Sequence, residues 1–322
     1  MDRTSHILPS VLDAIGHTPL VSLDRLTKEC GGKIYAKLEY LNPGFSRKDR
    51  VARQLMLDAL QDGSLRPGQP VIELTSGNTG TGLAIACAVL GHKFIAVMSK
   101  GNSPERARMM RALGADVVLV DQARGSAAGH VSGEDLALVE QETQRLTKEL
   151  SAFRADQFIL PGHIDCHYHG TAQEILAQTN GAFDAFCDFV GSGGTFGGCA
   201  RAFKEVNPRI QCLIVEPEGA AVLAGQPTTR PSHRIQGGGY GMRDLRAIDK
   251  RHVDGYLTVN DQDAVEGARL LARKEGIFAG FSAGANIAAA LNLLRRTGSG
   301  QRIVIVIPDS GLKYLSTDLW PA

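Results

Sequence analysis

The hydrophobic pattern of the chain alternates between short apolar runs and longer segments with helical periodicity. The apolar runs predict strands at Lys33–Leu38, Val71–Glu73, Lys93–Val97, Asp116–Leu119, Phe186–Val190, Gln211–Val215 and Arg302–Ile307. The amphipathic segments predict helices at Asp49–Gln61, Asn78–Leu90, Pro104–Leu113, Gly193–Glu205, Ala264–Glu275 and Ala283–Arg295. The last three strands are rich in Val, Ile or Phe, which is typical of strands buried on both faces. This alternation predicts an α/β fold with parallel sheets.

Two segments interrupt the alternation. Asp121–Asp135 is rich in Gly, Ala and Ser, and we expect it to form a surface loop, either a tolerated insertion or a functional lid. Gly225–Asp249 carries Pro, Gly and several Arg and is longer than a routine connection. Long irregular segments of this kind often have a function.

The composition narrows the class of protein. The 322 residues suffice for one large or two ordinary domains, and 35 basic against 34 acidic side chains give a net charge of +1. This balance gives no electrostatic reason to expect a nucleic acid or an anionic membrane as partner. The six cysteines form no CxxC pair, so no metal site is expected, and their scatter is typical of a reducing compartment. With no signal-like or membrane-spanning apolar run, we expect a cytoplasmic protein.

Lys48 lies where a predicted turn, Asn42–Arg47, leads into the helix expected at Asp49–Gln61. The positive potential at a helix N-terminus disfavours a protonated amine. A less protonated amine is what Schiff-base chemistry requires. An ordinary solvated lysine beside a capping serine would show the same local pattern, so both interpretations remain open.

Three other segments that lead into predicted helices are rich in glycine and hydroxyl groups: Thr75–Gly80 and Gly191–Gly198, which follow strands, and Gly280–Ala285, which follows an apolar segment. In Thr75–Gly80, backbone N–H groups and hydroxyls converge in a way that suits a carboxylate. In Gly191–Gly198, glycines allow close approach of a single phosphate group, although the loop matches neither a Walker motif nor a dinucleotide fingerprint. In the third segment, Ser282 either caps a helix or directs its hydroxyl toward the ligand that the other two segments would bind. Each turn could also be an ordinary polar connection.

These four elements, in this order, resemble the cysteine synthase and cystathionine β-synthase family of fold type II pyridoxal-phosphate enzymes. The resemblance extends from Ile15–Val21 (IGHTPLV) to Pro308–Thr317 (PDSGLKYLST), which is nearly the whole chain. It implies two doubly wound, three-layer αβα domains of the tryptophan synthase β-like type, with pyridoxal 5'-phosphate in the cleft between them. We expect a smaller domain at 48–157 and a larger one made of 1–47 and 158–322. It also implies a homodimer that acts on small amino-acid substrates.

The resemblance implies a role for each candidate residue. Lys48 would carry the cofactor as an internal aldimine and move the α-proton, Asn78 would bind the ring hydroxyl, and Ser282 would face the pyridine nitrogen. The cofactor phosphate would contact Gly191, Ser192, Gly193, Gly194 and Thr195. The substrate would contact Thr75, Ser76, Gly77, Thr79 and Gln157. A neutral serine at the pyridine nitrogen makes the ring a milder electron sink, which favours loss of the β-leaving group to an aminoacrylate that a nucleophile then attacks.

The chain departs from the cysteine synthase pattern in the loop that borders the second-substrate site of the family. After Ile235–Gln236, where the family usually has GIGAGFIP, this chain reads GGGYGMRD. We therefore assign Gly238, Tyr240 and Arg243 to the second-substrate site. Arg243 could pair with a carboxylate or phosphate on a nucleophile other than sulfide, or could be a solvated surface charge.

Three functions remain open on the sequence. The first is β-replacement on O-acetylserine or O-phosphoserine with a thiol, sulfide or amine as nucleophile, and Lys48-Asp49-Arg50 is the synthase form of the motif. The second is a β-eliminating lyase or dehydratase that releases pyruvate or another 2-oxo acid and ammonia. The third is a non-catalytic relative, against which the intact Lys48 argues.

Overall fold

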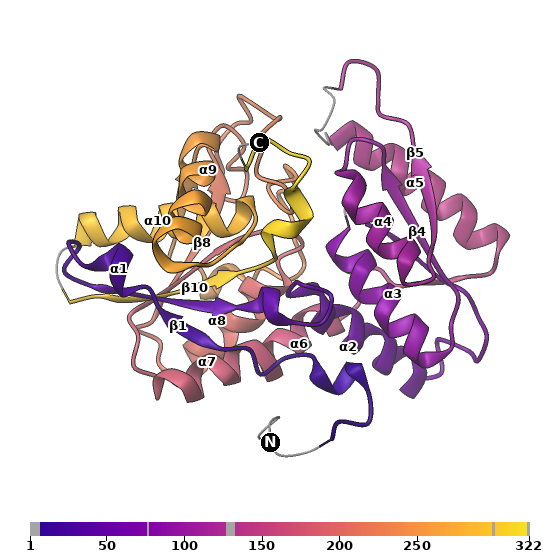
Figure 1. The fold of residues 1–322 in the computed structure, drawn as a ribbon, viewed down its shortest axis with the longest axis horizontal. Coiled ribbons are helices and arrows are strands. Elements are labelled where there is room, and N and C mark those ends of the chain that lie inside the picture. The colour runs from indigo at the N-terminus through magenta and orange to yellow at the C-terminus, as the bar shows by residue number, and fades with distance from the viewer. Residues whose placement is uncertain (1–6, 76, 127–132, 298–299, 321–322) are drawn as a thin grey trace. The chain divides into compact units, whose positions relative to one another are not determined.

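The computed structural model of the chain describes residues 7–75, 77–126, 133–297 and 300–320. These residues form two compact units (Figure 1): residues 7–16 with 41–163, and residues 17–40 with 164–320. The joins lie at 41 and 163, where the sequence suggested 48 and 157. Residues 7–16 belong to the first unit because Leu12 and Ile15 are buried in its core.

The first unit is built on a parallel sheet with the strand order β5-β4-β3-β6. Its elements are η1 (Val11–Ala14), α2 (Lys48–Gln61), β3 (Val71–Leu74), α3 (Asn78–Leu90), β4 (Phe94–Ser99), α4 (Pro104–Ala112), β5 (Asp116–Val120), α5 (Gly133–Glu149) and β6 (Phe153–Arg154). Side chains of α2, α3 and α4 pack on one face of the sheet, and Val139 of α5 packs on the other. The side chains of the strands therefore point alternately into two hydrophobic cores, and the unit has three layers: helices, sheet and helix.

The second unit is built on a sheet with the order β1-β2-β10-β7-β8-β9, in which only the pairing of β1 with β2 is antiparallel among the described strands. The strands are β1 (Leu20–Ser22), β2 (Lys33–Leu38), β7 (Ala185–Phe189), β8 (Gln211–Pro217), β9 (Gly255–Val259) and β10 (Arg302–Ile307). The main helices are α1 (Asp24–Thr27), α7 (Ala172–Thr179), α8 (Gly194–Val206), α9 (Asp261–Leu270) and α10 (Phe281–Thr297). Shorter helical segments of this unit are η3 (His167–Thr171), η4 (Lys250–His252), η5 (Leu271–Glu275) and η6 (Gly311–Tyr314). The segments η2 (Glu39–Leu41) and α6 (Gly162–Cys166) contain the points where the chain passes from one unit to the other.

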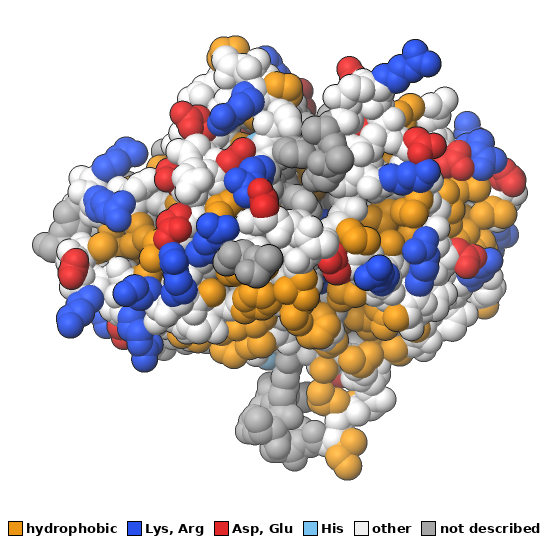
Figure 2. Space-filling model, turned by 45° about the horizontal axis from the view of Figure 1, so that its top comes forward, with side chains coloured by type: hydrophobic (Ala, Val, Ile, Leu, Met, Phe, Trp, Pro, Cys, Tyr) orange, Lys and Arg blue, Asp and Glu red, His pale blue; other side chains and the backbone are white. Residues whose placement is uncertain are grey.

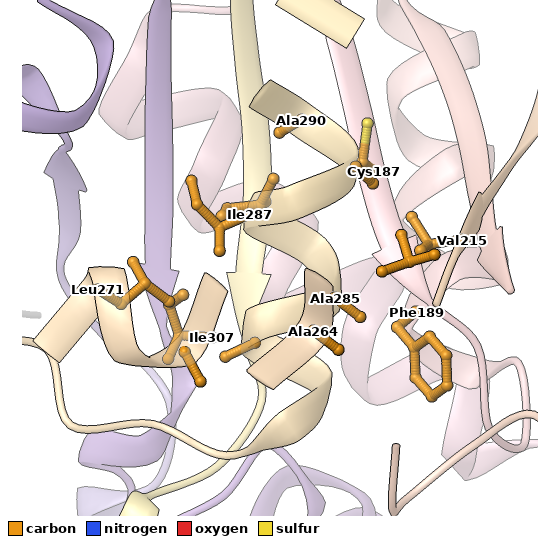
Figure 3. Close-up of a cluster of buried hydrophobic side chains, with 14 of the residues drawn as sticks. Cys187, Phe189, Val215, Ala264, Leu271, Ala285, Ile287, Ala290 and Ile307 are labelled. Carbon is orange, nitrogen blue, oxygen red and sulfur yellow. The ribbon is translucent and has the colours of Figure 1, made fainter. Parts of the chain in front are cut away.

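Helices cover both faces of this second sheet. Residues of α9 and α10 pack on one face, as Figure 3 shows for Ile287 and Ala290 beside Cys187 and Ile307. Residues of α7 and α8 pack on the opposite face, where Phe186 of β7 contacts Phe196 and Phe203 of α8. The two α/β units confirm the predicted fold class.

Close contact between α9 and α10 requires glycine. A Cβ added to Gly284 of α10 would lie 1.8 Å from the carbonyl oxygen of Ala264, and one added to Gly267 of α9 would lie 2.3 Å from the carbonyl oxygen of Gly284. No larger side chain fits between the two helices at this level. The crossing therefore fixes the position of the first turn of α10, which contains Ser282.

The structure corrects the prediction for Asp121–Asp135, because α5 already begins at Gly133. Asp135 is fully buried, and its carboxylate accepts hydrogen bonds from the backbone N–H of Ala123 (2.7 Å) and the hydroxyl of Ser126 (3.0 Å). The Gly, Ala and Ser residues of this segment are typical of loops, so the sequence did not indicate that a 17-residue helix begins within it. Residues 127–132 of the predicted loop lie outside the described residues. Gly225–Asp249 is irregular, as predicted.

A buried ion pair joins β3 to β6 in the first unit. The Nε of Arg154 lies 2.6 Å from Glu73, whose side chain is fully buried, and its Nη2 lies 2.8 Å from Glu140 on α5. Burial raises the pKa of Glu73, and the charge of Arg154 opposes that rise. Glu73 lies two residues before Thr75, and Arg154 lies three residues before Gln157, so this pair supports two predicted site segments.

The surface shown in Figure 2 carries interspersed basic and acidic side chains, with hydrophobic ones between them. Within residues 7–75, 77–126, 133–297 and 300–320, no helix is both long enough and apolar enough to span a membrane.

We expect Arg154→Met to lower the free energy of unfolding by about 3 kcal/mol, because it leaves the buried Glu73 without its cation. Urea unfolding followed by circular dichroism measures the change. The matched control is Arg145→Met, which removes a surface arginine paired with Glu142 and Glu149 and should leave the unfolding midpoint almost unchanged. Equal midpoints for the two variants would contradict a supporting role for the buried pair.

Candidate active site

Lys48 is the first residue of α2, as the sequence predicted. The turn before it is closed by Asp49, a buried side chain whose carboxylate accepts a hydrogen bond from the backbone N–H of Gly44. A Cβ on Gly44 would lie 2.5 Å from this carboxylate, so a larger residue would displace the side chain of Asp49. The backbone N–H of Lys48 also donates to the hydroxyl of Ser46 (3.3 Å). The turn therefore fixes where the lysine side chain leaves the backbone.

Gln157 brings two predicted site residues together. Its side-chain oxygen accepts hydrogen bonds from the Nζ of Lys48 (2.7 Å) and from the hydroxyl of Thr79 (2.7 Å). Gln157 is buried, and Lys48 is half-buried. The amine of Lys48 thus donates to an uncharged oxygen, and the two N–H groups of the Gln157 amide remain able to donate to a ligand.

The Thr75–Gly80 turn joins β3 to α3 and depends on Thr75. The Thr75 hydroxyl oxygen accepts hydrogen bonds from the backbone N–H groups of Gly77 (3.0 Å) and Gly80 (2.8 Å). Gly77 has φ +122°, and a Cβ there would lie 2.5 Å from the Cδ of the buried Arg106. Thr75 therefore has a clear structural role in the turn, and its role toward a substrate stays a prediction. Asn78, half-buried, begins α3, and Ser76 lies outside the described residues.

The glycine loop, residues 191–195, joins β7 to the N-terminus of α8 in the second unit. Gly193 is in the left-handed conformation (φ +86°), and a Cβ on Gly191 would lie 2.5 Å from the carbonyl oxygen of Gly237. Ser192, Gly193, Gly194 and Thr195 are buried. The first N–H groups of a helix have no partner within it, so a loop of this shape suits a phosphate group.

His167 is a residue that the sequence reasoning missed. It is buried, its Nδ1 lies 2.9 Å from the hydroxyl oxygen of Thr171, and its Nε2 lies 3.1 Å from the hydroxyl oxygen of Thr195. Both ring nitrogens therefore engage hydroxyl groups, and one of these hydroxyls belongs to the glycine loop. The spacing of His167 and Thr171, four residues apart on a helical segment, is the only local signal that could have indicated this pair.

Ser282 is buried in the first turn of α10, and Asn286 on the next turn anchors that end of the helix. The side-chain oxygen of Asn286 accepts from the backbone N–H of Phe189 on β7 (2.7 Å), and its nitrogen donates to the carbonyl of Val306 on β10 (2.8 Å). These bonds tie the first turns of α10 to the ends of two neighbouring strands. The sequence reasoning did not identify Asn286, because its partners are 97 and 20 residues away.

The predicted second-substrate loop lies against the glycine loop in its first part. A Cβ on Gly238 would lie 2.4 Å from the carbonyl oxygen of Val190, and the backbone N–H of Gly239 donates to the same oxygen (3.0 Å). A narrow cavity of about 10 Å³ has Gly191 and the half-buried Tyr240 among its walls. Arg243 is exposed and lines a separate, larger cavity.

The described residues contain no group of three or more His, Cys, Asp or Glu side chains that could hold a metal ion. All six cysteines are free thiols. Burial raises the pKa of the Cys87 and Cys212 thiols to about 12 and also raises that of Cys187. These thiols are therefore protonated and poor nucleophiles at neutral pH.

Comparisons with known proteins identify the family of this chain. The model of the family described as "Pyridoxal-phosphate dependent enzyme" matches residues 11–309. The chain is 36% identical to a cysteine synthase of Staphylococcus aureus over 313 residues, which cover 97% of this chain and 96% of that protein. It is 37% identical to a cystathionine beta-synthase of Apis mellifera over 317 residues, which cover 96% of this chain but span only 61% of that longer protein.

A solved structure gives the same result. A variant of O-ureido-L-serine synthase with O-ureido-L-serine bound superposes with a TM-score of 0.89 at 36% identity, covering 98% of this chain and 94% of that one. The match to the family model and the match over nearly the full length of a cysteine synthase, together with the lysine turn and the glycine loop, lead to one conclusion. The chain belongs to the pyridoxal-phosphate-dependent enzyme family that includes cysteine synthase and cystathionine beta-synthase.

Proposed function

We propose that this enzyme catalyses β-replacement on O-acetylserine or O-phosphoserine, with a nucleophile that is larger than sulfide or anionic, such as an amine or thiol. The observation that carries the proposal is the convergence of Lys48 and Thr79 on the side-chain oxygen of Gln157. This set provides an amine for proton transfer beside donors for an amino-acid carboxylate. The similarity to a synthase solved with an O-substituted serine supports chemistry at the serine side chain.

The chain's residues fit pyridoxal 5'-phosphate, the cofactor of this family. The glycine loop, with its close backbone approach at Gly191 and the N-terminus of α8, would bind the phosphate. Lys48 would hold the cofactor through its amine, Asn78 would bind the ring hydroxyl and Ser282 would face the pyridine nitrogen. When bound, the cofactor supplies an electron sink that makes the α-proton of an amino acid acidic.

Different side chains of the protein would then transfer the proton and bind the substrate carboxylate. The Nζ of Lys48 takes the α-proton of the substrate. The amide N–H groups of Gln157 remain available to donate to the substrate carboxylate, because its oxygen is occupied by Lys48 and Thr79. The hydroxyls of Thr75, Ser76 and Thr79 and the backbone of Gly77 complete this carboxylate site in the proposal. Holding the carboxylate at several points orients the α-proton toward the lysine.

The choice of nucleophile rests on the second-substrate loop. Tyr240 and Arg243 occupy positions where cysteine synthases usually have small or apolar residues, and Gly238 allows the loop to pack against Val190. A bulky phenol and an exposed guanidinium suit a larger, anionic nucleophile better than sulfide.

A β-eliminating lyase is the alternative function, because elimination would use the same lysine and carboxylate site. Lys48-Asp49-Arg50 followed by Val51 and Ala52, in place of the glycine usual in dehydratases, favours replacement. Release of pyruvate from either serine ester in the absence of a nucleophile would favour the lyase. We further propose a homodimer in the cytoplasm, and the six free thiols support a reducing compartment.

We expect Lys48→Ala to abolish both turnover and the visible absorption band of the bound cofactor, because no other group takes the place of its amine. Absorption spectra and a coupled assay of leaving-group release measure the two effects. The control is Lys93→Ala, a surface lysine paired with Asp116 that should retain both properties. Normal turnover by the Lys48 variant would contradict the assignment.

Arg243→Ala should raise the KM of an anionic nucleophile about tenfold, as expected for loss of one charge-assisted hydrogen bond, with a smaller effect on the serine ester. Steady-state kinetics with each substrate varied separately give the two values. Arg209→Ala, which removes an exposed arginine elsewhere in the same unit, is the control. Equal effects on both substrates would argue against a nucleophile-site role for Arg243.

His167→Asn should weaken binding of pyridoxal phosphate to the apoenzyme by about tenfold or less, because Thr195 loses a hydrogen-bond partner that orients it. Fluorescence titration with the cofactor measures the affinity. His169→Asn, on the same segment but exposed, is the matched control. Unchanged affinity in a folded His167 variant would separate His167 from the phosphate site.

A further inference from the structure

The segment between β8 and β9 forms an open cavity of about 170 Å³ in the second unit. Its charged walls are Arg243, Asp244, Arg246 and Lys250, and its apolar walls include Leu223 and Leu245. A cavity of this size can hold a molecule as large as benzene, so it has room for a phosphate or carboxylate group. Three cations thus lie within eight consecutive residues around one cavity.

The cations of this cavity lack protein partners, in contrast to those around them. All three cations, Arg243, Arg246 and Lys250, are exposed. Among the described residues, they form no ion pair and no side-chain hydrogen bond. The neighbouring Arg251 pairs with Asp249 at 2.6 Å. With Asp244 as the one acid in the wall, the cavity carries two net positive charges at neutral pH. Such a concentration of charge attracts anions.

The cavity-forming segment is held rigidly against the start of α8. A Cβ on Gly197 would lie 1.9 Å from the carbonyl oxygen of Ala247, and a Cβ on Gly193 would lie 3.0 Å from the Cβ of Ala247. The backbone N–H of Ile248 donates to the carbonyl of Leu245 (2.9 Å), which closes a turn that contains Arg246. The backbone at Arg246 is therefore fixed by contacts within the protein, which lowers the entropic cost of binding a ligand there.

The cavity adjoins the glycine loop but is separate from it. The narrow cavity beside Gly191 shares the walls Leu223 and Leu245 with the cationic one. Its volume of about 10 Å³ is at the lower limit for a single water molecule. An anion in the cationic cavity would therefore lie outside the glycine loop, although the two are joined through Ala247 and Gly193.

We propose that the cavity is an anion site that binds a small phosphate- or carboxylate-bearing molecule through Arg246 and Lys250, with Arg243 as a third cation in its wall. A guanidinium offers two parallel donors to such a group, and an ammonium adds a compact charge. The anion is either part of a substrate or a separate metabolite. The inference does not depend on the identity of the reaction, because it concerns binding alone.

The test is calorimetric titration of the cofactor-loaded enzyme with inorganic phosphate at low ionic strength, so that the glycine loop is already occupied. We expect saturable binding that weakens at least about tenfold in the double variant Arg246→Gln with Lys250→Gln, which removes the charges and keeps most of each side-chain stem. The matched control is Arg296→Gln with Lys274→Gln, two exposed cations elsewhere in the same unit, and should bind phosphate as the unaltered enzyme does. Retention of the cofactor band shows that each variant is folded.

Absence of saturable binding, or equal affinity in the two double variants, would overturn the proposal. A repeat with succinate establishes whether a carboxylate is accepted as well as a phosphate. In turnover assays, competition between phosphate and the nucleophile would identify the anion as part of that substrate, and an effect on kcat alone would identify a separate metabolite. Because the titration needs no turnover, failure of the anion site and failure of the proposed reaction are distinguished.

Discussion

Close approach of the backbone at the carboxyl ends of parallel strands is the constraint on which the candidate site depends. In the first unit Gly77 lies against the buried Arg106, and in the second Gly191 lies against the carbonyl of Gly237. Gly280, before α10, lies so close to Asp309 that a Cβ would be 2.3 Å from its carboxylate. Two of these helices, α3 and α8, can then begin directly after β3 and β7, with their first N–H groups at the edge of the sheet where ligands of open α/β sheets bind.

Side chains far away in sequence hold these turns in place. Gln157 joins Lys48 to Thr79, while Asn286 ties α10 to β7 and β10. His167 does the same for Thr195 at the start of α8. The functional groups are thus positioned by buried polar side chains that form hydrogen bonds. Such networks give a fixed geometry, because any other arrangement would leave a buried polar group without a partner.

The sequence predicts the elements that are marked by a local hydrophobic pattern or motif. It does not predict features that depend on contacts between residues far apart in the chain. β2, β10 and α3 have the predicted bounds, because each is a clear apolar or helical run between turn residues. The short strands β1 and β6 and the edge strand β9 were not predicted, since two to five residues carry little periodicity. Lys48 and the glycine loop follow from motifs. His167 and Asn286 do not, because only the folded chain brings their partners to them.

We conclude that this enzyme binds pyridoxal phosphate, and we propose that it acts on an activated serine. The visible absorption spectrum of the purified protein before and after addition of O-acetylserine or O-phosphoserine tests both statements. The account predicts a yellow protein whose band changes with one of these donors and returns when a suitable nucleophile is added. A colourless protein that takes up no added pyridoxal phosphate would contradict it.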